Sequence, residues 1–478
     1  MEHDLTMLVD LYELTMANGM LLDGKKDTVT YFDMFFRRVP DDGGYAIMAG
    51  VEQLMDYFEN LHFSEDDIAY LRGLGCFSAQ FLDYLKDFHF ECDVWSIPEG
   101  TPIFPKEPII TVKGPVIQTM MVETTLLLMI NHQSLIATKA NRVVRSAGGH
   151  PVVEFGARRA QGDTAATLGS RAAYIGGCVG TSNLEASKLF NIPPYGTMAH
   201  SWIQLFGSEY EAFKVYAEHY PTNCVLLIDT YNVLKSGLPT AIRVFNDILK
   251  PKGYRPAGVR IDSGDITYLS KKIRKILDEA GYEDCKILVS NSLDEYIIRD
   301  MRIQGAKVDS YCVGERLITA SSEPVFGGVY KLAAVEEGGQ IIPRIKISEN
   351  VEKITLPGFK TIWRLFDRET GKAIADVVTL ANEEIDDTKP YEIFDPDHTW
   401  KRKTVTNFFA KRIKVQIFQG GKRIYESPSV QEIQKYCAEQ IGTLWDEVLR
   451  FENPHEYYVD LSQKLWDMRH ELLSKYSK

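Results

Sequence analysis

The segment GVRIDSGD, residues 258–265, combines a cation, an acid and a tight turn in one short stretch. Arg260 and Asp262 are two residues apart, so on a strand their side chains point to the same face. Ser263 and Gly264 then permit a turn with free backbone N–H groups, which can hold an anion. A carboxylate for sugar hydroxyls beside an anion-binding turn suits a ribose phosphate. The alternative is an ordinary strand-to-helix turn with a helix N-cap.

Two other segments carry groups that could do chemistry. VVEFGARRAQG places Arg158 and Arg159 just after an apolar run, and guanidinium groups match the geometry of phosphates and carboxylates. A surface charge pair is the alternative for these two arginines. GTMAHSWIQLFGSEYEAF contains His200 before an acid-rich helical pattern. A lone histidine is more often structural, so only its position at an expected strand end distinguishes His200.

The elements that must position these residues follow from short apolar runs between residues 150 and 335. The runs are PVVEFG, AYIGGCVG, CVLLIDT, AGVRIDSGD, KILVSNS, VDSYCVGE and GVYKLAAV. Amphipathic segments separate several of them, such as ITYLSKKIRKILDEAG, in which Gly281 is a plausible C-cap. This alternation predicts a parallel sheet covered by helices, and seven runs favour an irregular α/β barrel over an open sheet.

Polar residues gather at the expected carboxyl ends of these strands, which is the face that holds the active site of an α/β barrel. They are Arg158, Thr181, Ser182, Asp229, Thr230, Asp262, Ser263, Asn291 and Gly314. Turn and N-cap preferences explain any single one of them. Caps do not require Arg158 or the two acids of IDSGD, so the set as a whole indicates a site.

The regions on either side have a different character. Residues 1–135 mix an aromatic strand, TYFDMFFRR, with a helix, MAGVEQLMDYFENL, and a proline-rich stretch around residues 97–115 predicts short edge strands. Residues 341–478 predict an α+β region with hairpins around Thr370-Gly371 and Gly420-Gly421. The barrel is therefore expected to span residues 136–340.

Composition narrows the class of protein. The net charge is −12, which argues against a large nucleic-acid or anionic-membrane surface. Seven scattered cysteines without a C-x-x-C indicate neither a disulfide framework nor a zinc site. The sequence contains no signal peptide and no stretch apolar enough to span a bilayer, so we expect a cytoplasmic protein. P-loop, G-x-G-x-x-G and H-E-x-x-H motifs are missing as well.

Eight segments, in order, resemble the nicotinate phosphoribosyltransferase family. They are LVDLYELTMANG, FFRRVPDDGGYAIMAG, VVEFGARRAQG, GTMAHSWIQLFGSE, GVRIDSGD, SNSLDEY, FGGVYKL and NPHEYYVDLSQKL. The resemblance implies an irregular α/β barrel beside an N-terminal α/β sandwich, in a homodimer with shared active sites. It also implies formation of nicotinate mononucleotide and pyrophosphate from nicotinate and phosphoribosyl pyrophosphate. ATP hydrolysis through a phosphohistidine would accompany this reaction, with Mg²⁺ on the pyrophosphate.

The resemblance also assigns roles around the base. Phe155 is expected to stack on the pyridine ring, and Tyr12 on its other face from the partner subunit. Arg158 is similar to an arginine near the pyrophosphate or the base. Within CVGTSNLEAS, Ser182 occupies the position at which nicotinamide phosphoribosyltransferases carry an aspartate. A serine can donate to the carboxylate of nicotinate, whereas an aspartate would repel it, which favours nicotinate.

The remaining assignments concern ribose, phosphate and ATP. Asp262 is similar to the acid that binds the ribose hydroxyls, with Arg260 nearby. Asn291 and Gly314 resemble residues of the loops that bind the 5-phosphate. His200 resembles the phosphorylated histidine. Three alternatives remain: a nicotinamide phosphoribosyltransferase, a barrel that binds a sugar phosphate without catalysis, and a scaffold protein. The second has no use for His200, and the third explains none of the strand-end residues.

Overall fold

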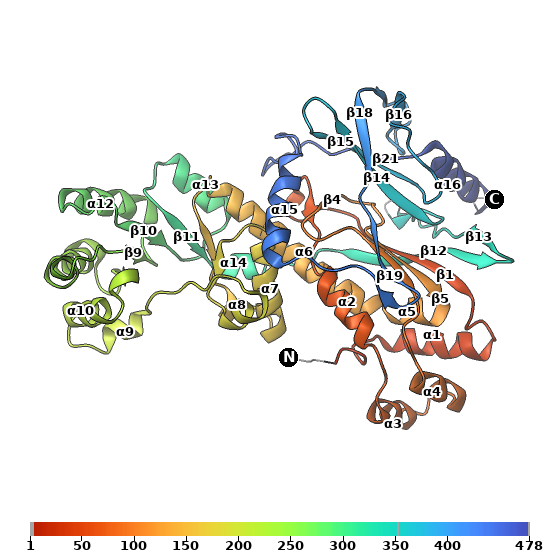
Figure 1. The fold of residues 1–478 in the computed structure, drawn as a ribbon, viewed down its shortest axis with the longest axis horizontal. Helices are drawn as coiled ribbons and strands as arrows, with labels where there is room; N and C mark the ends of the chain where they lie inside the picture. The colour runs from red at the N-terminus through yellow and green to blue at the C-terminus, as the bar shows by residue number, and fades with distance from the viewer. Residues whose placement is uncertain (1–3, 351–352, 477–478) are drawn as a thin grey trace. The chain divides into compact units, whose positions relative to one another are not determined.

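The computed structural model describes residues 4–350 and 353–476, and the chain divides into two compact units (Figure 1). Unit 1 consists of Met1–Leu135 and Val325–Lys478, and unit 2 of Ile136–Pro324. From the sequence, domain boundaries are expected between residues 135 and 136 and between residues 340 and 341. In the structure the second division falls at 324/325, and the C-terminal part of the chain joins the N-terminal part in one unit.

Unit 2 is built on a six-stranded parallel sheet with the order β7-β6-β11-β10-β9-β8. Its strands are β6 (Val152–Glu154), β7 (Gly180–Thr181), β8 (Val225–Leu227), β9 (Gly258–Ile261), β10 (Lys286–Val289) and β11 (Ser310–Val313). The first strand, β6, pairs with the last, β11, so the strands follow chain order around a ring with one unpaired step between β7 and β8. This arrangement confirms the predicted irregular α/β barrel.

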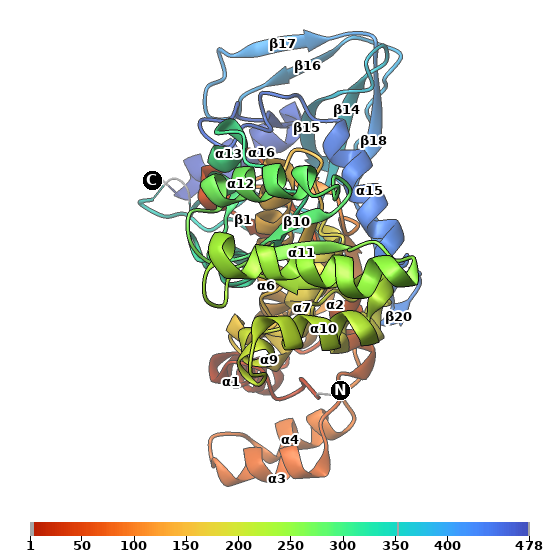
Figure 2. The same cartoon turned by 90° about the vertical axis from the view of Figure 1, so that its left-hand side faces the viewer.

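Helices connect the strands of unit 2. They are α7 (Asp163–Ile175), α8 (Leu184–Phe190), α9 (His200–Gln204), α10 (Glu209–His219), α11 (Leu238–Val244), α12 (Ile266–Glu279), α13 (Glu295–Ile303) and α14 (Glu315–Ile318). Figures 1 and 2 show α10, α11 and α12 lying beside one another on the outer side of β9 and β10. Asp265 caps α12 by accepting from the backbone N–H of Tyr268, and Gly281 follows the helix at φ +80°, as its position predicts.

Three sequence-based expectations for strands are wrong in whole or in part. In AYIGGCVG, residues 173–175 end α7, and only Gly180 lies in a strand, the two-residue β7. GVYKLAAV forms β12 in the antiparallel sheet of unit 1 rather than a barrel strand. The proline-rich stretch supplies a short strand paired on one side only, Pro102–Ile103, as expected, but it also supplies β5, which lies between β1 and β3 and is therefore not an edge strand. Apolar runs reveal burial, but they do not reveal which partner strand a segment pairs with.

Unit 1 contains a seven-stranded sheet, β13-β12-β1-β5-β3-β19-β20, and a four-stranded sheet, β18-β14-β15-β21. The strands of the larger sheet are β1 (Val29–Phe36), β3 (Asp93–Ser96), β5 (Ile110–Pro115), β12 (Gly328–Glu337), β13 (Gln340–Pro343), β19 (Val415–Gln419) and β20 (Lys422–Arg423). The smaller sheet consists of β14 (Lys360–Asp367), β15 (Ala373–Leu380), β18 (Phe408–Arg412) and β21 (Val459–Leu461). The larger sheet therefore needs strands from both ends of the chain. The two predicted hairpins are confirmed as β14-β15 and β19-β20.

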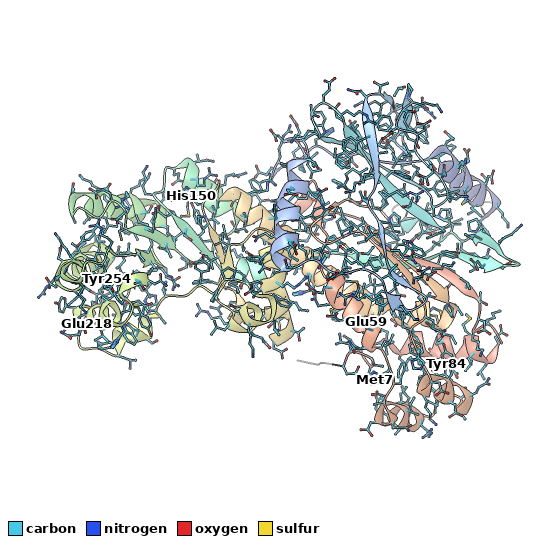
Figure 3. All side chains as sticks on the ribbon, in the orientation of Figure 1. Met7, Glu59, Tyr84, His150, Glu218 and Tyr254 are labelled. Carbon is cyan, nitrogen blue, oxygen red and sulfur yellow. The ribbon has the colours of Figure 1, made fainter. Side chains whose placement is uncertain are left out.

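Two short ladders and the remaining helices complete unit 1. The ladders pair β2 (Ala46–Ile47) with β4 (Pro102–Ile103) and β16 (Tyr391–Phe394) with β17 (Arg402–Val405). The helices are α1 (Leu11–Leu22), α2 (Val51–Asn60), α3 (Glu65–Gly73), α4 (Ala79–Lys86), α5 (Val116–Met121), α15 (Val430–Gly442) and α16 (Gln463–Tyr476). Helix α6 (Glu123–Ser146) contains the boundary between the units. Side chains fill the spaces between these elements, and Tyr84 of α4, labelled in Figure 3, stacks on Phe81. Across residues 4–350 and 353–476, none of the helices has both the length and the apolarity needed to cross a bilayer.

Candidate active site

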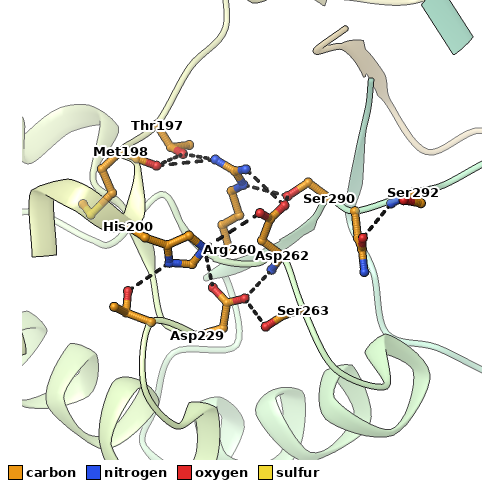
Figure 4. A network of polar contacts seen from close by, with 11 residues as sticks. Thr197, Met198, His200, Asp229, Arg260, Asp262, Ser263, Ser290 and Ser292 are labelled. Atoms are coloured by element: carbon orange, nitrogen blue, oxygen red, sulfur yellow. Dashed lines mark hydrogen bonds and ion pairs between the residues drawn. The ribbon is translucent and has the colours of Figure 1, made fainter. Parts of the chain in front are cut away.

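The carboxyl ends of β8 and β9 are held together by Asp229 (Figure 4). Its Oδ2 atom accepts from the hydroxyl of Ser263 at 2.7 Å and from the backbone N–H of Asp262 at 2.9 Å. The Asp229 side chain is only 1% exposed, and its Oδ1 atom is buried without a hydrogen-bond donor. This carboxylate therefore fixes the turn after β9.

His200 is the first residue of α9 and faces this pair of acids. Its Nε2 atom lies 3.9 Å from Oδ1 of Asp229 and 3.8 Å from Oδ2 of Asp262, and its Nδ1 atom lies 3.1 Å from the hydroxyl of Thr230. With 39% of its side chain exposed, the imidazole remains open to a ligand. When Nδ1 carries the proton and donates to Thr230, Nε2 presents its lone pair as a nucleophile.

Arg260 forms the other side of the network. Its guanidinium donates to Ser290 Oγ through Nε at 2.9 Å and to Thr197 Oγ1 through Nη1 at 2.9 Å, and Nη2 lies 3.4 Å from Oδ1 of Asp262. The Ser290 hydroxyl in turn donates to the same Asp262 oxygen. The guanidinium also lies 5.6 Å from the ring centroid of Phe155. Arg260 is mostly buried, so it holds Asp262 in place.

The loops after β6 and β7 are joined by Glu154, whose side chain is fully buried. Its carboxylate accepts from Thr181 Oγ1 at 2.6 Å, from Ser170 Oγ at 2.9 Å and from the backbone N–H of Gly156. Its backbone carbonyl accepts from the N–H of Ser182 at 2.9 Å. Burial raises the pKa of Glu154, and the three donated hydrogen bonds oppose that rise. The side chain of Ser182 is exposed.

Phe155 lies between these loops and β11. Its N–H donates to the carbonyl of Val313 at 2.8 Å, and its ring is partly exposed. Gly314 approaches so closely that a Cβ there would lie 2.9 Å from the carbonyl oxygen of Phe155, which explains the glycine. Arg158 belongs to a short 3₁₀ turn, Ala157–Arg159, and is exposed.

A cleft of about 320 Å³ opens beside the N-terminus of α12. Gly264, at φ +82°, and Asn291, at φ +123°, both line it, together with Thr267 and Arg316. The side-chain oxygen of Asn291 accepts from the backbone N–H of Ser292 at 2.8 Å, which supports its unusual conformation. Glycine, backbone N–H groups and an arginine suit a phosphate group.

Comparison with known proteins decides the family. Models of the nicotinate phosphoribosyltransferase N-terminal domain, family and C-terminal domain match residues 7–131, 151–301 and 359–469. The chain is 42% identical to nicotinate phosphoribosyltransferase of Bacillus subtilis, over 99% of this chain and 97% of that protein. The chain belongs to the nicotinate phosphoribosyltransferase family. The resemblance that the sequence segments indicated is thereby confirmed.

Other relatives of the family agree with this assignment. Human nicotinate phosphoribosyltransferase is 31% identical over 96% of this chain and 95% of its own length. The crystal structure of human nicotinic acid phosphoribosyltransferase matches with a TM-score of 0.85 and 28% identity, covering 98% of this chain and 100% of that one. A nicotinate-nucleotide pyrophosphorylase from Pyrococcus furiosus, at 24% identity and a TM-score of 0.71, shares the fold.

The residues selected from the sequence divide between the two units. Ten of them lie in unit 2: Arg158, Phe155, Ser182, His200, Arg260, Asp262, Ser263, Gly264, Asn291 and Gly314. Tyr12 lies in unit 1, on α1, and is 45% exposed. Burial, together with the carboxylate of Glu123, raises the pKa of Tyr12 to about 12.

Three residues of the polar network were missed. Ser290 ends the apolar run KILVS, and its position at a strand end was the available signal. Glu154 was visible as an acid inside the apolar run PVVEFG. Thr197 lies in the loop before α9, and no sequence signal distinguished it. Hydrogen bonds between separate strand ends cannot be read from one segment alone.

The acidic pair can be compared with the needs of Mg²⁺, which the family implies. Among the residues that the structure describes, no three His, Cys, Asp or Glu side chains are grouped so that they could hold a metal ion. Mg²⁺ commonly uses one or two carboxylates together with substrate phosphates and water. Asp262, whose side chain is 30% exposed, would suit that shared mode, whereas the side chain of Asp229 is only 1% exposed.

Proposed function

We propose that this protein transfers the phosphoribosyl group of phosphoribosyl pyrophosphate to nicotinate. The ring nitrogen attacks C1 of the sugar as the bond from C1 to the pyrophosphate oxygen breaks, giving nicotinate mononucleotide and pyrophosphate. The supporting observation is the cluster of His200, Asp229, Asp262 and Arg260 at the carboxyl ends of β8 and β9, in a chain of this family. The names of the relatives supply nicotinate as the substrate.

The sugar and its phosphates are assigned to the β9 and β10 ends. Asp262 accepts from ribose hydroxyls, and Arg260 and Ser290 hold its carboxylate in position. The cleft beside Gly264 and Asn291 takes the 5-phosphate. Positioning is the main requirement, because a transition state with cationic character at C1 needs the base, the sugar and the leaving group in line.

The base is assigned to the loops after β6 and β7. Phe155 stacks on the pyridine ring, and the exposed hydroxyl of Ser182 donates to the carboxylate of nicotinate. Arg158 follows Phe155 closely in the sequence, and its side chain is exposed. Its guanidinium supplies a positive charge for the carboxylate of nicotinate or for the pyrophosphate. Within residues 181–183 no side chain is acidic, so nothing in that stretch repels a carboxylate.

His200 is assigned to the coupled hydrolysis of ATP. Its Nε2 atom attacks the γ-phosphorus, the bond to the β,γ-bridging oxygen breaks, and ADP leaves. Water later hydrolyses the phosphohistidine to phosphate and free His200. The hydroxyl of Thr230 holds the imidazole in place through Nδ1, and in the tautomer with the proton on Nδ1 the lone pair of Nε2 is free to attack. Mg²⁺ supplies charge neutralisation for the phosphate oxygens when it is bound.

The assembly is assigned as a homodimer with shared active sites, located in the cytoplasm. Tyr12 supports the dimer, because an aromatic ring that is 45% exposed on α1 is available to a partner chain. In this assignment the partner subunit's Tyr12 stacks on the face of the pyridine ring opposite Phe155. Exposed large aromatic rings are enriched at protein interfaces.

Purified protein tests the function directly. It is incubated with phosphoribosyl pyrophosphate, Mg²⁺ and either nicotinate or nicotinamide, with and without ATP, and the mononucleotide and ADP are quantified. We expect nicotinate mononucleotide, formed faster with ATP. Preference for nicotinamide would indicate a nicotinamide phosphoribosyltransferase. Binding of phosphoribosyl pyrophosphate without product would indicate a barrel that binds the sugar phosphate but does not catalyse the reaction.

A further inference from the structure

Unit 1 contains a second cavity of about 110 Å³ that none of the assigned substrates uses. Its walls come from β1, β12, β14, β21 and α16 and from the loops around residues 106–108, 354–356 and 396–397. Most of the wall is apolar: Phe35, Pro108, Leu332, Ile354, Leu356, Pro396, Val459 and Leu461. The space is smaller than the cavity of about 150 Å³ that holds benzene in an engineered protein, so it suits the apolar part of a small ligand whose polar end lies at the rim.

The floor of the cavity is formed by a buried ion pair of Lys360 and Asp33. The ammonium group of Lys360 lies 2.8 Å from Asp33 Oδ2 and donates to the carbonyls of Leu356 at 2.8 Å and Gly358 at 2.6 Å. An ammonium group has three protons, and these are three acceptors. Lys360 and Asp33 are both buried, so they neutralise each other and form a fixed polar base.

The rim carries excess positive charge. Asp397 is one carboxylate between two cations, with Lys106 Nζ at 2.9 Å and Arg469 Nη1 at 3.3 Å. Burial would raise the pKa of Asp397, but Lys106 and Arg469 hold it below its ordinary value. The Nε–H of Arg469 is buried and has no hydrogen-bond acceptor within the described chain. The guanidinium of Arg469 is therefore only partly neutralised by Asp397.

From these contacts we infer that the cavity binds a small monocarboxylic acid with an apolar body. The body lies against Leu332, Ile354 and Leu461, and the carboxylate accepts from Arg469 and Lys106 at the rim. A single negative charge balances the cation that Asp397 leaves unpaired. A neutral molecule of the same shape fills the apolar part and leaves the positive charge of the rim unbalanced.

Methyl NMR of the full-length protein tests this site, with benzoate as the probe and benzyl alcohol as its neutral counterpart. Benzoate should shift the methyl signals of Leu332, Ile354 and Leu461 in a saturable manner, and benzyl alcohol should bind at least about tenfold more weakly. Leu332, Ile354 and Leu461 line this cavity, so saturable shifts of their methyl groups report benzoate that is bound there. Absence of saturable shifts up to the solubility limit, or equal affinity for both probes, would overturn the inference.

Single substitutions distinguish the contribution of the Arg469 charge to binding from that of the apolar space. Arg469→Gln should raise the Kd for benzoate about tenfold or more and leave the Kd for benzyl alcohol within about twofold of its original value. Lys464→Gln, an exposed cation on the same helix and outside the cavity, is the matched control and should change neither. Leu332→Trp fills the cavity and should abolish the binding of both benzoate and benzyl alcohol. Retained binding of benzoate by a folded Arg469→Gln or Leu332→Trp protein, with folding checked by circular dichroism, would place the probe elsewhere.

Discussion

The carboxylate of Glu154, on β6, accepts a hydrogen bond of 2.6 Å from the hydroxyl of Thr181, on β7. The same carboxylate accepts from Ser170 on α7 and from the backbone of Gly156. The two loops that carry Phe155 and Ser182 thus share one buried acceptor. We regard Glu154 as a positioning residue for the proposed nicotinate site, because it touches the loops rather than the substrate.

Replacing Glu154 with glutamine should therefore raise the KM for nicotinate more than it lowers kcat. The amide replaces one of the two acceptor oxygens with an N–H₂ donor where three donors already converge, so at least one of these hydrogen bonds is lost at a cost of about 1 to 3 kcal/mol. Steady-state kinetics should show a KM raised about tenfold. Glu218→Gln, an exposed acid on α10, serves as the control. An unchanged KM in a folded Glu154→Gln enzyme would remove the positioning role.

Introducing a carboxylate at position 182 should impair the use of nicotinate. Two like charges about 4 Å apart repel by roughly 1 to 4 kcal/mol between bulk water and a protein surface, so Ser182→Asp should lower kcat/KM for nicotinate at least about tenfold. Ser182→Asn has a similar shape without the charge and should lose much less. Equal activity of the two variants would show that position 182 does not face the substrate carboxylate.

Removing the imidazole of His200 should abolish ATP hydrolysis while leaving a slow transferase reaction. His200→Asn keeps a polar side chain at the start of α9 but has no nucleophilic nitrogen. Incubation with γ-labelled ATP should label the unaltered protein with an acid-labile phosphate and leave the variant unlabelled. His219→Asn, an exposed histidine on α10, should label normally. Full ATP stimulation in a folded His200→Asn protein would assign the coupling to another residue.

Subunit mixing tests the shared site. Tyr12→Ala and Asp262→Ala proteins should each be nearly inactive alone. In randomly exchanged dimers, each mixed dimer has one site with both residues intact, so about a quarter of all sites should recover. Sedimentation should show a dimer. Recovery of no activity after verified exchange, or a fully active monomer, would contradict a site completed by the partner subunit.

Stability should depend on pH through Asp460 in β21. Burial, with the nearby carboxylate of Asp395, raises its pKa to about 7, well above the ordinary value of about 3.9. The folded state therefore binds more protons than the unfolded state, so stability should fall as the pH rises from about 4 to about 7 and then level off. Burial raises the pKa of Glu13 to about 7 as well, which adds a contribution of the same sign.

Asp460→Asn should remove part of the loss of folding stability at high pH, because asparagine resembles the protonated acid. Thermal unfolding at about pH 8 should show a higher Tm for the variant than for the unaltered protein, and the difference should shrink at about pH 5. Asp467→Asn, an exposed acid on α16, should have little effect at either pH. The same Tm difference at both pH values would mean that Asp460 does not titrate in this window.

The sequence by itself determined the local elements and the chemistry of individual strand ends. The period of ITYLSKKIRKILDEAG, with a glycine at its end, predicted α12, and the spacing in GVRIDSGD placed Arg260 and Asp262 on the same face at the end of a strand. These features depend on residues that are neighbours in the chain, so spacing and side-chain type are sufficient to predict them.

Only the tertiary structure decided which segments are partners. GVYKLAAV pairs with β1 because strand pairing depends on contacts made about 300 residues apart, a separation that the run itself does not encode. The approach of His200 to both Asp229 and Asp262 and the junction of two loops at Glu154 depend in the same way on several strand ends meeting on one face. Side-chain types can be read along the chain, whereas distances between strand ends exist only once the barrel has formed.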